Sequence, residues 1–169
     1  MDKNTIWIDE NENDLGEVSV SKAHQEGLLH RISVVYLTND RSQILIQIRD
    51  DGRIDHSAAG HVDVGESYQE AAKRELEEEL GVRGVELTEI GDCSSEEDRG
   101  KTRHKFRVFQ CKANPDKPNP DEVKEVFWAD PREIWNDMKG DDGDKKYCGG
   151  FRSTLELFLR ELQNPLEKI

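Results

Sequence analysis

Three glutamates in one short segment are the residues of this sequence best suited to chemistry. Glu75, Glu78 and Glu79 lie close together in the chain. On a helix, at about 100° per residue, their carboxylates fall within an arc of roughly 100°. Carboxylates so close repel one another and weaken the helix unless something neutralises them. Hard oxygen ligands of this kind suit Mg²⁺, or alternatively Mn²⁺, better than zinc. The segment therefore predicts a divalent-metal site on one face of a helix.

The element that must carry these carboxylates is a helix expected over residues 67 to 80 and ending at Gly81. An apolar stripe adjoins the carboxylates and should dock the helix on a sheet; it consists of Ala72, Leu76 and Leu80. Glu70 and Glu77 should point away, where i,i+4 pairs with Arg74 and Lys73, respectively, are expected.

The overall charge of the chain also favours a bound divalent cation. The formal net charge is −13, from 37 acidic and 24 basic residues. Such a surface repels nucleic acid backbones and anionic membranes, so neither is expected as a partner. An anionic small molecule could still bind if divalent cations screened it locally.

The cysteines and the amino terminus bear on the compartment. Cys93, Cys111 and Cys148 are odd in number and far apart, which predicts reduced thiols rather than disulfides or a cysteine zinc site. The amino-terminal sequence has no apolar stretch of signal-peptide length, and no run approaches membrane-spanning length. We expect a cytoplasmic protein.

Alternating and apolar runs predict the remaining elements. Two hairpins are expected, from strands at 5–8 and 17–20 and at 32–37 and 44–48, with a short helical patch at 21–28 between them. Later strands are expected at 85–90, 106–111 and 126–128, a short helix at 131–138, and a last helix opened by a capping box at 153–156. The stripe of that last helix is Leu155, Phe158, Leu159 and Leu162. The chain reads as a single α/β domain over residues 1–169 with a mixed sheet.

The glutamates belong to a longer motif, GHVDVGESYQEAAKRELEEELGV at residues 60 to 82. Gly60 is followed by five residues and Glu66, and then by seven residues and Arg74-Glu75-Leu76. One residue separates this run from Glu78-Glu79, and one more residue separates Glu79 from Gly81-Val82. The motif resembles the Nudix box at all nine of its defined positions, a far more specific match than a lone glycine motif.

The resemblance implies a Nudix-type α/β/α sandwich with an amino-terminal β-hairpin, and Mg²⁺-dependent hydrolysis of a diphosphate linkage in a nucleoside diphosphate derivative or a related substrate. It makes Glu75, Glu78 and Glu79 catalytic metal ligands, with the Gly60 carbonyl as a further ligand. The base that activates water would be Glu75 or a carboxylate outside the box. Glu66 and Arg74 would organise the helix. The resemblance is also compatible with a homodimer.

A second resemblance is to isopentenyl-diphosphate isomerases, through Ser57-Ala58-Ala59-Gly60-His61 and the segment Leu29-His30-Arg31 after the first hairpin. Those enzymes place a catalytic cysteine directly before the Gly-His pair, where this chain has Ala59. They also carry metal-binding glutamates where this chain has Arg103-His104-Lys105. We therefore expect a hydrolase of the isomerase-like branch. An isomerase-like enzyme and a non-catalytic diphosphate-binding module are the alternatives.

The sequence defines neither the substrate nor the residues that bind it. Substrate selection is expected in two loops, at 93–103 and 139–151. The five histidines show no zinc-type spacing among themselves; they are His24, His30, His56, His61 and His104. For His61, which follows Gly60, a place near the metal and a purely structural role are equally open.

Overall fold

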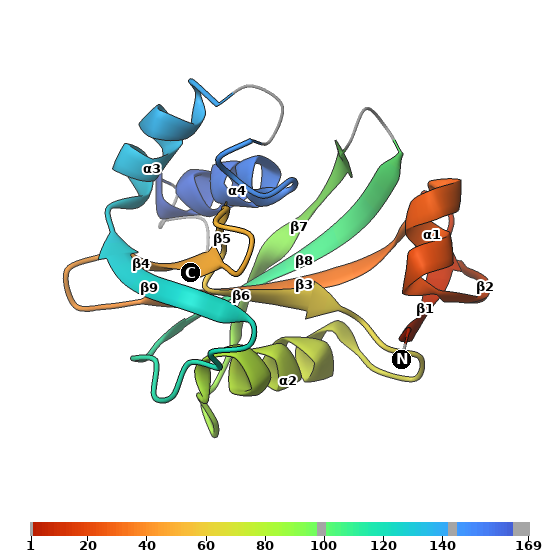
Figure 1. The fold of residues 1–169 in the computed structure, drawn as a ribbon, viewed down its shortest axis with the longest axis horizontal. Helices are drawn as coiled ribbons and strands as arrows, with labels where there is room; N and C mark the ends of the chain where they lie inside the picture. Colours follow the sequence, from red (N-terminus) through yellow and green to blue (C-terminus); the bar gives the residue numbers. More distant parts are fainter. Residues whose placement is uncertain (1, 98–100, 142–144, 164–169) are drawn as a thin grey trace.

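The computed structural model describes residues 2–97, 101–141 and 145–163. A nine-stranded mixed sheet is covered by helices on both faces (Figure 1). The strands are β1 (Asn4–Ile8), β2 (Asp14–Ser19), β3 (His30–Thr38), β4 (Ile44–Arg49), β5 (Ile54–Asp55), β6 (Ala58–His61), β7 (Thr88–Glu97), β8 (Thr102–Lys112) and β9 (Val123–Ala129). The helices are α1 (Val20–Glu26), α2 (Tyr68–Leu80), α3 (Pro131–Met138) and α4 (Phe151–Gln163). Within these residues, none of the helices has the length and apolar character needed to cross a membrane.

Strand β3 lies at the centre of the sheet. It pairs antiparallel with β1, β4 and β6, and parallel with β8 over nine residue pairs from His30↔His104 to Thr38↔Lys112. Strands β1 and β2 form the predicted amino-terminal hairpin. Together with the helices on both faces, this pairing confirms the predicted α/β/α sandwich with a mixed sheet.

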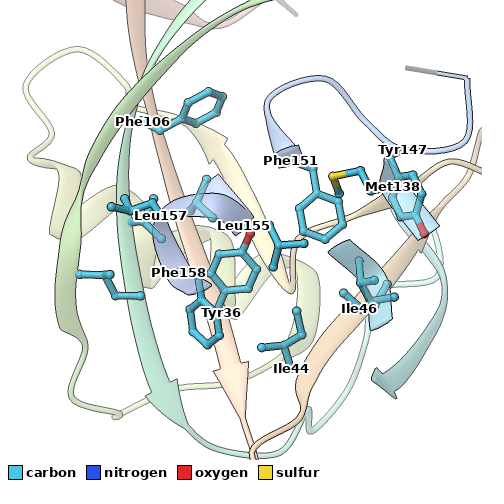
Figure 2. Packing of buried hydrophobic residues seen from close by; sticks show 14 of the residues in the cluster. Tyr36, Ile44, Ile46, Phe106, Met138, Tyr147, Phe151, Leu155, Leu157 and Phe158 are labelled. Carbon is cyan, nitrogen blue, oxygen red and sulfur yellow. The ribbon is translucent and has the colours of Figure 1, made fainter. Parts of the chain in front are cut away.

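Each strand alternates its side chains between two cores. From β3, Val34 and Tyr36 pack on the side of α3 and α4, whereas Val35 and Leu37 pack on the side of α2. Figure 2 shows the first of these cores, in which Tyr36 lies against Phe158 with ring centroids 4.8 Å apart. The second core contains the predicted docking stripe of α2, whose three residues are fully buried: Ala72, Leu76 and Leu80.

The start of the last helix differs from the prediction. Helix α4 begins at Phe151 and not at the predicted box around Ser153. Thr154 is fully buried, and its hydroxyl bonds the Phe151 carbonyl (3.1 Å) and Tyr36 (2.9 Å). The Thr154 hydroxyl therefore makes its hydrogen bonds inside the helix and in the core, and does not cap the helix. The predicted stripe also ends early, because Leu162 is 40% exposed.

The predicted loop at 93–103 is largely wrong as well. Strands β7 and β8 are longer than their apolar segments and form a hairpin that pairs from Thr88↔Gln110 to Glu97↔Thr102. Polar residues extend the two strands because pairing along β3 supports the ladder, and context of this kind overrides β-propensity. Residues 98–100 of this segment, and 142–144 of the other expected loop, lie outside the described residues.

Candidate active site

Helix α2 is fixed at both ends by caps. Ser67 accepts a hydrogen bond from the Glu70 amide (3.1 Å), and Glu70 accepts one from the Ser67 amide (2.8 Å), which together form a capping box. Gly81 ends the helix in the left-handed region, with φ of 69°. The predicted Glu70–Arg74 pair is therefore wrong, because the Glu70 carboxylate is used as a cap. The predicted partner of Glu77 is also wrong, since Glu77 pairs with Arg83 across the helix end (3.0 Å).

The capped helix does not present its three glutamates equally. Glu75 and Glu79, one turn apart, are 8% and 7% exposed and line a cleft of about 620 Å³. The side chain of Glu78 is 43% exposed and lies within 3.4 Å of the Arg74 guanidinium. The cleft therefore contains two of the three predicted carboxylates, and the third lies at the margin of the same helix face.

Gly60 lies directly against the Glu75 carboxylate. A Cβ atom at residue 60 would lie 2.0 Å from both Cδ and Oε1 of Glu75. No side chain fits there unless the glutamate moves. Glycine is required at this position because β6 and α2 approach closely, and the backbone of residue 60 consequently borders the carboxylate.

Arg74 connects the predicted site residues. Its guanidinium donates to Glu66 through Nε (2.8 Å) and Nη2 (2.9 Å), to Glu75 (2.5 Å), and to the carbonyl of His61 (2.9 Å). Glu66 also accepts the Asp63 amide (3.0 Å), which orders the turn before α2. The hydrogen bonds from Arg74 lower the pKa of Glu66. Arg74 thus connects α2 to the turn before it through Glu66 and to β6 through the His61 carbonyl.

The environment of the two buried glutamates disfavours their charged forms. Burial raises the pKa of Glu75, with Arg74 opposing the shift and Glu78 adding to it. Burial raises the pKa of Glu79 well above its ordinary value, and the Glu75 and Asp55 carboxylates raise it further. A nearby cation would relieve both effects, because opposite charge favours the ionised forms.

Gln47 is a positioning residue that the sequence reasoning missed. Its side-chain amide donates to Glu79 and to the Ser57 carbonyl (3.1 Å), and the side chain is 4% exposed. It holds one Glu79 oxygen while the Ala59 amide lies 3.4 Å from the other. The signal was present: Gln47 is the one polar residue in the apolar run 44–48. A polar side chain buried in a central strand needs a partner.

Four of the five histidines lie close together in the structure. His24, His30, His61 and His104 come together in space, with one ring nitrogen from each lying within 4.8 Å of the others. Spacing along the chain did not indicate this cluster, because these residues meet through strand pairing: His30 lies opposite His104 in the parallel ladder, and His61 lies opposite Ile32.

The cleft also carries positive charge near the buried carboxylates. Lys3 and Arg49 line the same cleft as Glu75 and Glu79. Carboxylates outside the box reach it too, from the end of β5 and the segment before β9: Asp55, Asp121 and Glu122. Of the cysteines, Cys148 borders the cleft, and all three are free thiols as predicted.

Comparison with known proteins agrees with this fold. The model of the NUDIX domain matches residues 28–148. The "Uncharacterized Nudix hydrolase YfcD" of Escherichia coli K12 is 33% identical over 140 residues, which span 77% of this chain and 77% of that protein. The isopentenyl-diphosphate Delta-isomerase of Serratia proteamaculans is 28% identical over 144 residues, which span 79% of this chain and 80% of that enzyme.

Solved structures show the same fold. The protein DR0079 of Deinococcus radiodurans superposes with a TM-score of 0.73 at 20% identity, covering 91% of this chain and 97% of that one. A MutT NUDIX hydrolase of Burkholderia pseudomallei gives a TM-score of 0.60 at 20% identity, covering 76% and 97% of the two chains. The mixed sheet and the glutamate-bearing helix beneath it define the α/β/α sandwich of this class. The chain belongs to the Nudix family.

Proposed function

We propose that this protein is a hydrolase that cuts a diphosphate linkage in a nucleoside diphosphate derivative or a related small molecule, with Mg²⁺ or Mn²⁺ as cofactor. The observation that carries the proposal is the pair of buried carboxylates, Glu75 and Glu79, in a cleft that also holds cationic side chains. Two buried acids one turn apart are costly without a cation.

The residues present fit a hard divalent cation. Glu75, Glu78 and Glu79 would supply carboxylate oxygens, and Gly60, whose backbone borders Glu75, would supply its carbonyl. All are oxygen donors, the class that Mg²⁺ prefers. When bound, the metal would neutralise the diphosphate and lower the pKa of an attacking water.

The chain's own groups would do the remaining work. Arg74 holds the Glu75 carboxylate in the cleft, and Gln47 holds that of Glu79. The base that takes a proton from water is Glu75 or a carboxylate outside the box, for which Asp55 and Glu122 lie in the cleft. Lys3 and Arg49, which line the cleft, would contact phosphate oxygens.

A hydrolysis screen tests the proposal. Nucleotide sugars, dinucleotide cofactors, nucleoside triphosphates and prenyl diphosphates are incubated with millimolar Mg²⁺, and released phosphate or nucleotide is measured. Activity on at least one diphosphate class, lost in EDTA and restored by Mg²⁺, is expected. Binding of the same compounds without turnover would instead indicate a non-catalytic module, and turnover in a metal-free preparation would refute the metal's role.

A further inference from the structure

One carboxylate of the cleft belongs neither to the box nor to the exposed surface. Asp55 is the last residue of β5; its side chain is 14% exposed and lines the cleft together with Glu75 and Glu79. Burial raises the pKa of Glu79, and the charge of Asp55 adds to that shift, so the two carboxylates lie close enough to interact. Asp55 therefore faces the part of the cleft that holds the glutamates of the box.

The two carboxylate oxygens of Asp55 have different partners. Oδ1 accepts a hydrogen bond from the backbone amide of His56 (2.8 Å) and lies 2.6 Å from the ring nitrogen Nδ1 of the same residue. Oδ2 lies 3.6 Å from Nη1 of Arg49, which is beyond ordinary hydrogen-bonding distance. The neighbouring thiol of Cys148 is only a weak donor. Oδ1 is therefore fixed by His56, whereas Oδ2 retains lone pairs that can accept a proton.

His56 is itself held from its far side by the protein core. The residue is 2% exposed, and its Nε2 lies 2.6 Å from the hydroxyl oxygen of Thr154 on α4. That oxygen lies 2.9 Å from the Tyr36 hydroxyl on β3. The contact between Nδ1 and Asp55 is close, although its angle is not that of a hydrogen bond. Because an ionised carboxylate can only accept, the nitrogen that faces it carries a proton. Groups on β3 and α4 thus set the orientation of the imidazole beside Asp55.

Asp55 is ionised in spite of its burial. Burial would raise the pKa of this carboxyl, but its interactions with His56 and the positive charge of Arg49 outweigh that effect and lower the pKa. The carboxylate is therefore available as a proton acceptor at neutral pH.

The other carboxylates of the cleft are less suited to accept a proton from water. Glu75 and Glu79 would use their lone pairs to bind the metal. Among the described residues, the remaining carboxylates that line the cleft are exposed to solvent: Asp50, Asp121 and Glu122. Asp55 differs from all of these, because it is shielded from solvent, fixed at one oxygen and open at the other.

We propose that Asp55 is the base that takes a proton from the attacking water, with His56 as its positioning residue. The inference rests on the proposed hydrolysis and assigns one step of it. The water oxygen forms a bond to phosphorus, one water proton passes to Oδ2, and the bridging P–O bond breaks with its electron pair leaving on the departing phosphate. The water becomes more acidic as its bond to phosphorus forms, so an ionised carboxylate of low pKa suffices as the acceptor. Asp55 later returns the proton to solvent.

The first test compares Asp55→Asn with the parent protein on the compound that the parent hydrolyses fastest in the screen. Asparagine keeps the size of the side chain but accepts a proton poorly, so kcat should fall at least about a hundredfold while KM changes by less than about threefold. Mg²⁺ alone should still raise the Tm of the variant as it does that of the parent, because a base is not a metal ligand. Asp40→Asn, an exposed change in the turn after β3, is the control and should keep its rate within about twofold.

The outcomes separate this role from the proposed function. Full activity in Asp55→Asn, with an active parent, would refute the role and leave the proposed function standing. Loss of the rise in Tm with Mg²⁺ in Asp55→Asn would also refute it, because Asp55 would then bind the metal. A parent protein that hydrolyses none of the screened compounds would refute the proposed function, and the role of Asp55 with it.

The second test concerns His56 and uses two substitutions of the same chemical type. Asparagine presents its amide nitrogen near the place of Nδ1, beside Asp55, whereas glutamine presents its amide nitrogen near the place of Nε2, beside Thr154. His56→Asn should therefore keep kcat within about fivefold of the parent, and His56→Gln should lose at least about tenfold more, with KM unchanged in both. A purely structural role would make kcat follow the Tm of the two variants. Equal kcat values in the two variants, or a larger loss in His56→Asn, would overturn the positioning role.

Discussion

Replacing Gly60 with alanine perturbs the candidate active site at its tightest point. The added Cβ would lie 2.0 Å from Glu75 Cδ and 2.6 Å from Oε2, whereas ordinary Cβ contacts begin at 3.4 Å. The carboxylate would have to withdraw by about 1.4 Å, the difference between the closest approach and that contact limit. Arg74 opposes this movement, because its guanidinium donates to Glu75 at 2.5 Å.

The expected cost has two parts. Overpacking of a tight site costs about 1–3 kcal/mol, which for a domain of this size corresponds to a Tm lower by about 2–12 °C. The rate of metal-dependent hydrolysis should fall at least about a hundredfold, because Glu75 can no longer occupy its position in the cleft. Both effects should appear together, since one displaced side chain causes them.

Thermal unfolding and initial rates at saturating Mg²⁺ provide the assay. Gly140→Ala is the matched control, because its nearest neighbour would lie 3.5 Å from the new Cβ, an ordinary contact, and its φ is not positive. Adding Glu75→Ala to Gly60→Ala removes the clash. In that background Gly60→Ala should cost less than about 0.5 kcal/mol, a strong departure from additivity. A Gly60→Ala protein as stable and as active as its parent would refute the close approach.

Three further predictions concern the same cleft. Glu78→Gln and Glu79→Gln should each lower the rate at least about a hundredfold, whereas Glu77→Gln should change it little; equal losses in all three would contradict the assigned helix face. Burial raises the pKa of Glu79 above its ordinary 4.5, so in EDTA the folded protein binds more protons than the unfolded chain above that pH, and stability falls as pH rises. Glu79→Gln removes this loss, and its Tm advantage in EDTA should be smallest at pH 4 and grow toward pH 7; an advantage independent of pH would contradict it. The parent protein should not interconvert isopentenyl and dimethylallyl diphosphate, because Ala59 carries no proton donor or acceptor; isomer detected by NMR in the parent would overturn the assignment as a hydrolase. Ala59→Cys should fail as well, because this chain has Arg103-His104-Lys105 where the isomerases carry glutamates.

The fold was predictable wherever local chemistry and tertiary packing favour the same structure. The capping residue Ser67 and the stop at Gly81 bracket α2 in the sequence as they do in the structure. The apolar runs of β3 and β4 are confirmed for the same reason, because both strands are buried on both faces. The β7–β8 hairpin was missed beyond its apolar segments, since its polar ends are held by pairing that spacing along the chain does not encode.

The box residues were predictable as a set, but their separate environments were not. A helical wheel places Glu75, Glu78 and Glu79 on one arc, yet it carries no information on where the sheet ends. The sheet buries Glu75 and Glu79 and leaves Glu78 exposed on its side. Gln47 and the histidine cluster were missed because each depends on contacts between elements far apart in sequence.

The backbone of β6 links the box to the histidines. The Ala59 amide lies 3.4 Å from Glu79, Gly60 borders Glu75, and the His61 carbonyl accepts from Arg74 at 2.9 Å. The His61 ring, on the same residue, lies in the imidazole cluster 3.1 Å from His24. A change at His61 would therefore disturb both regions at once.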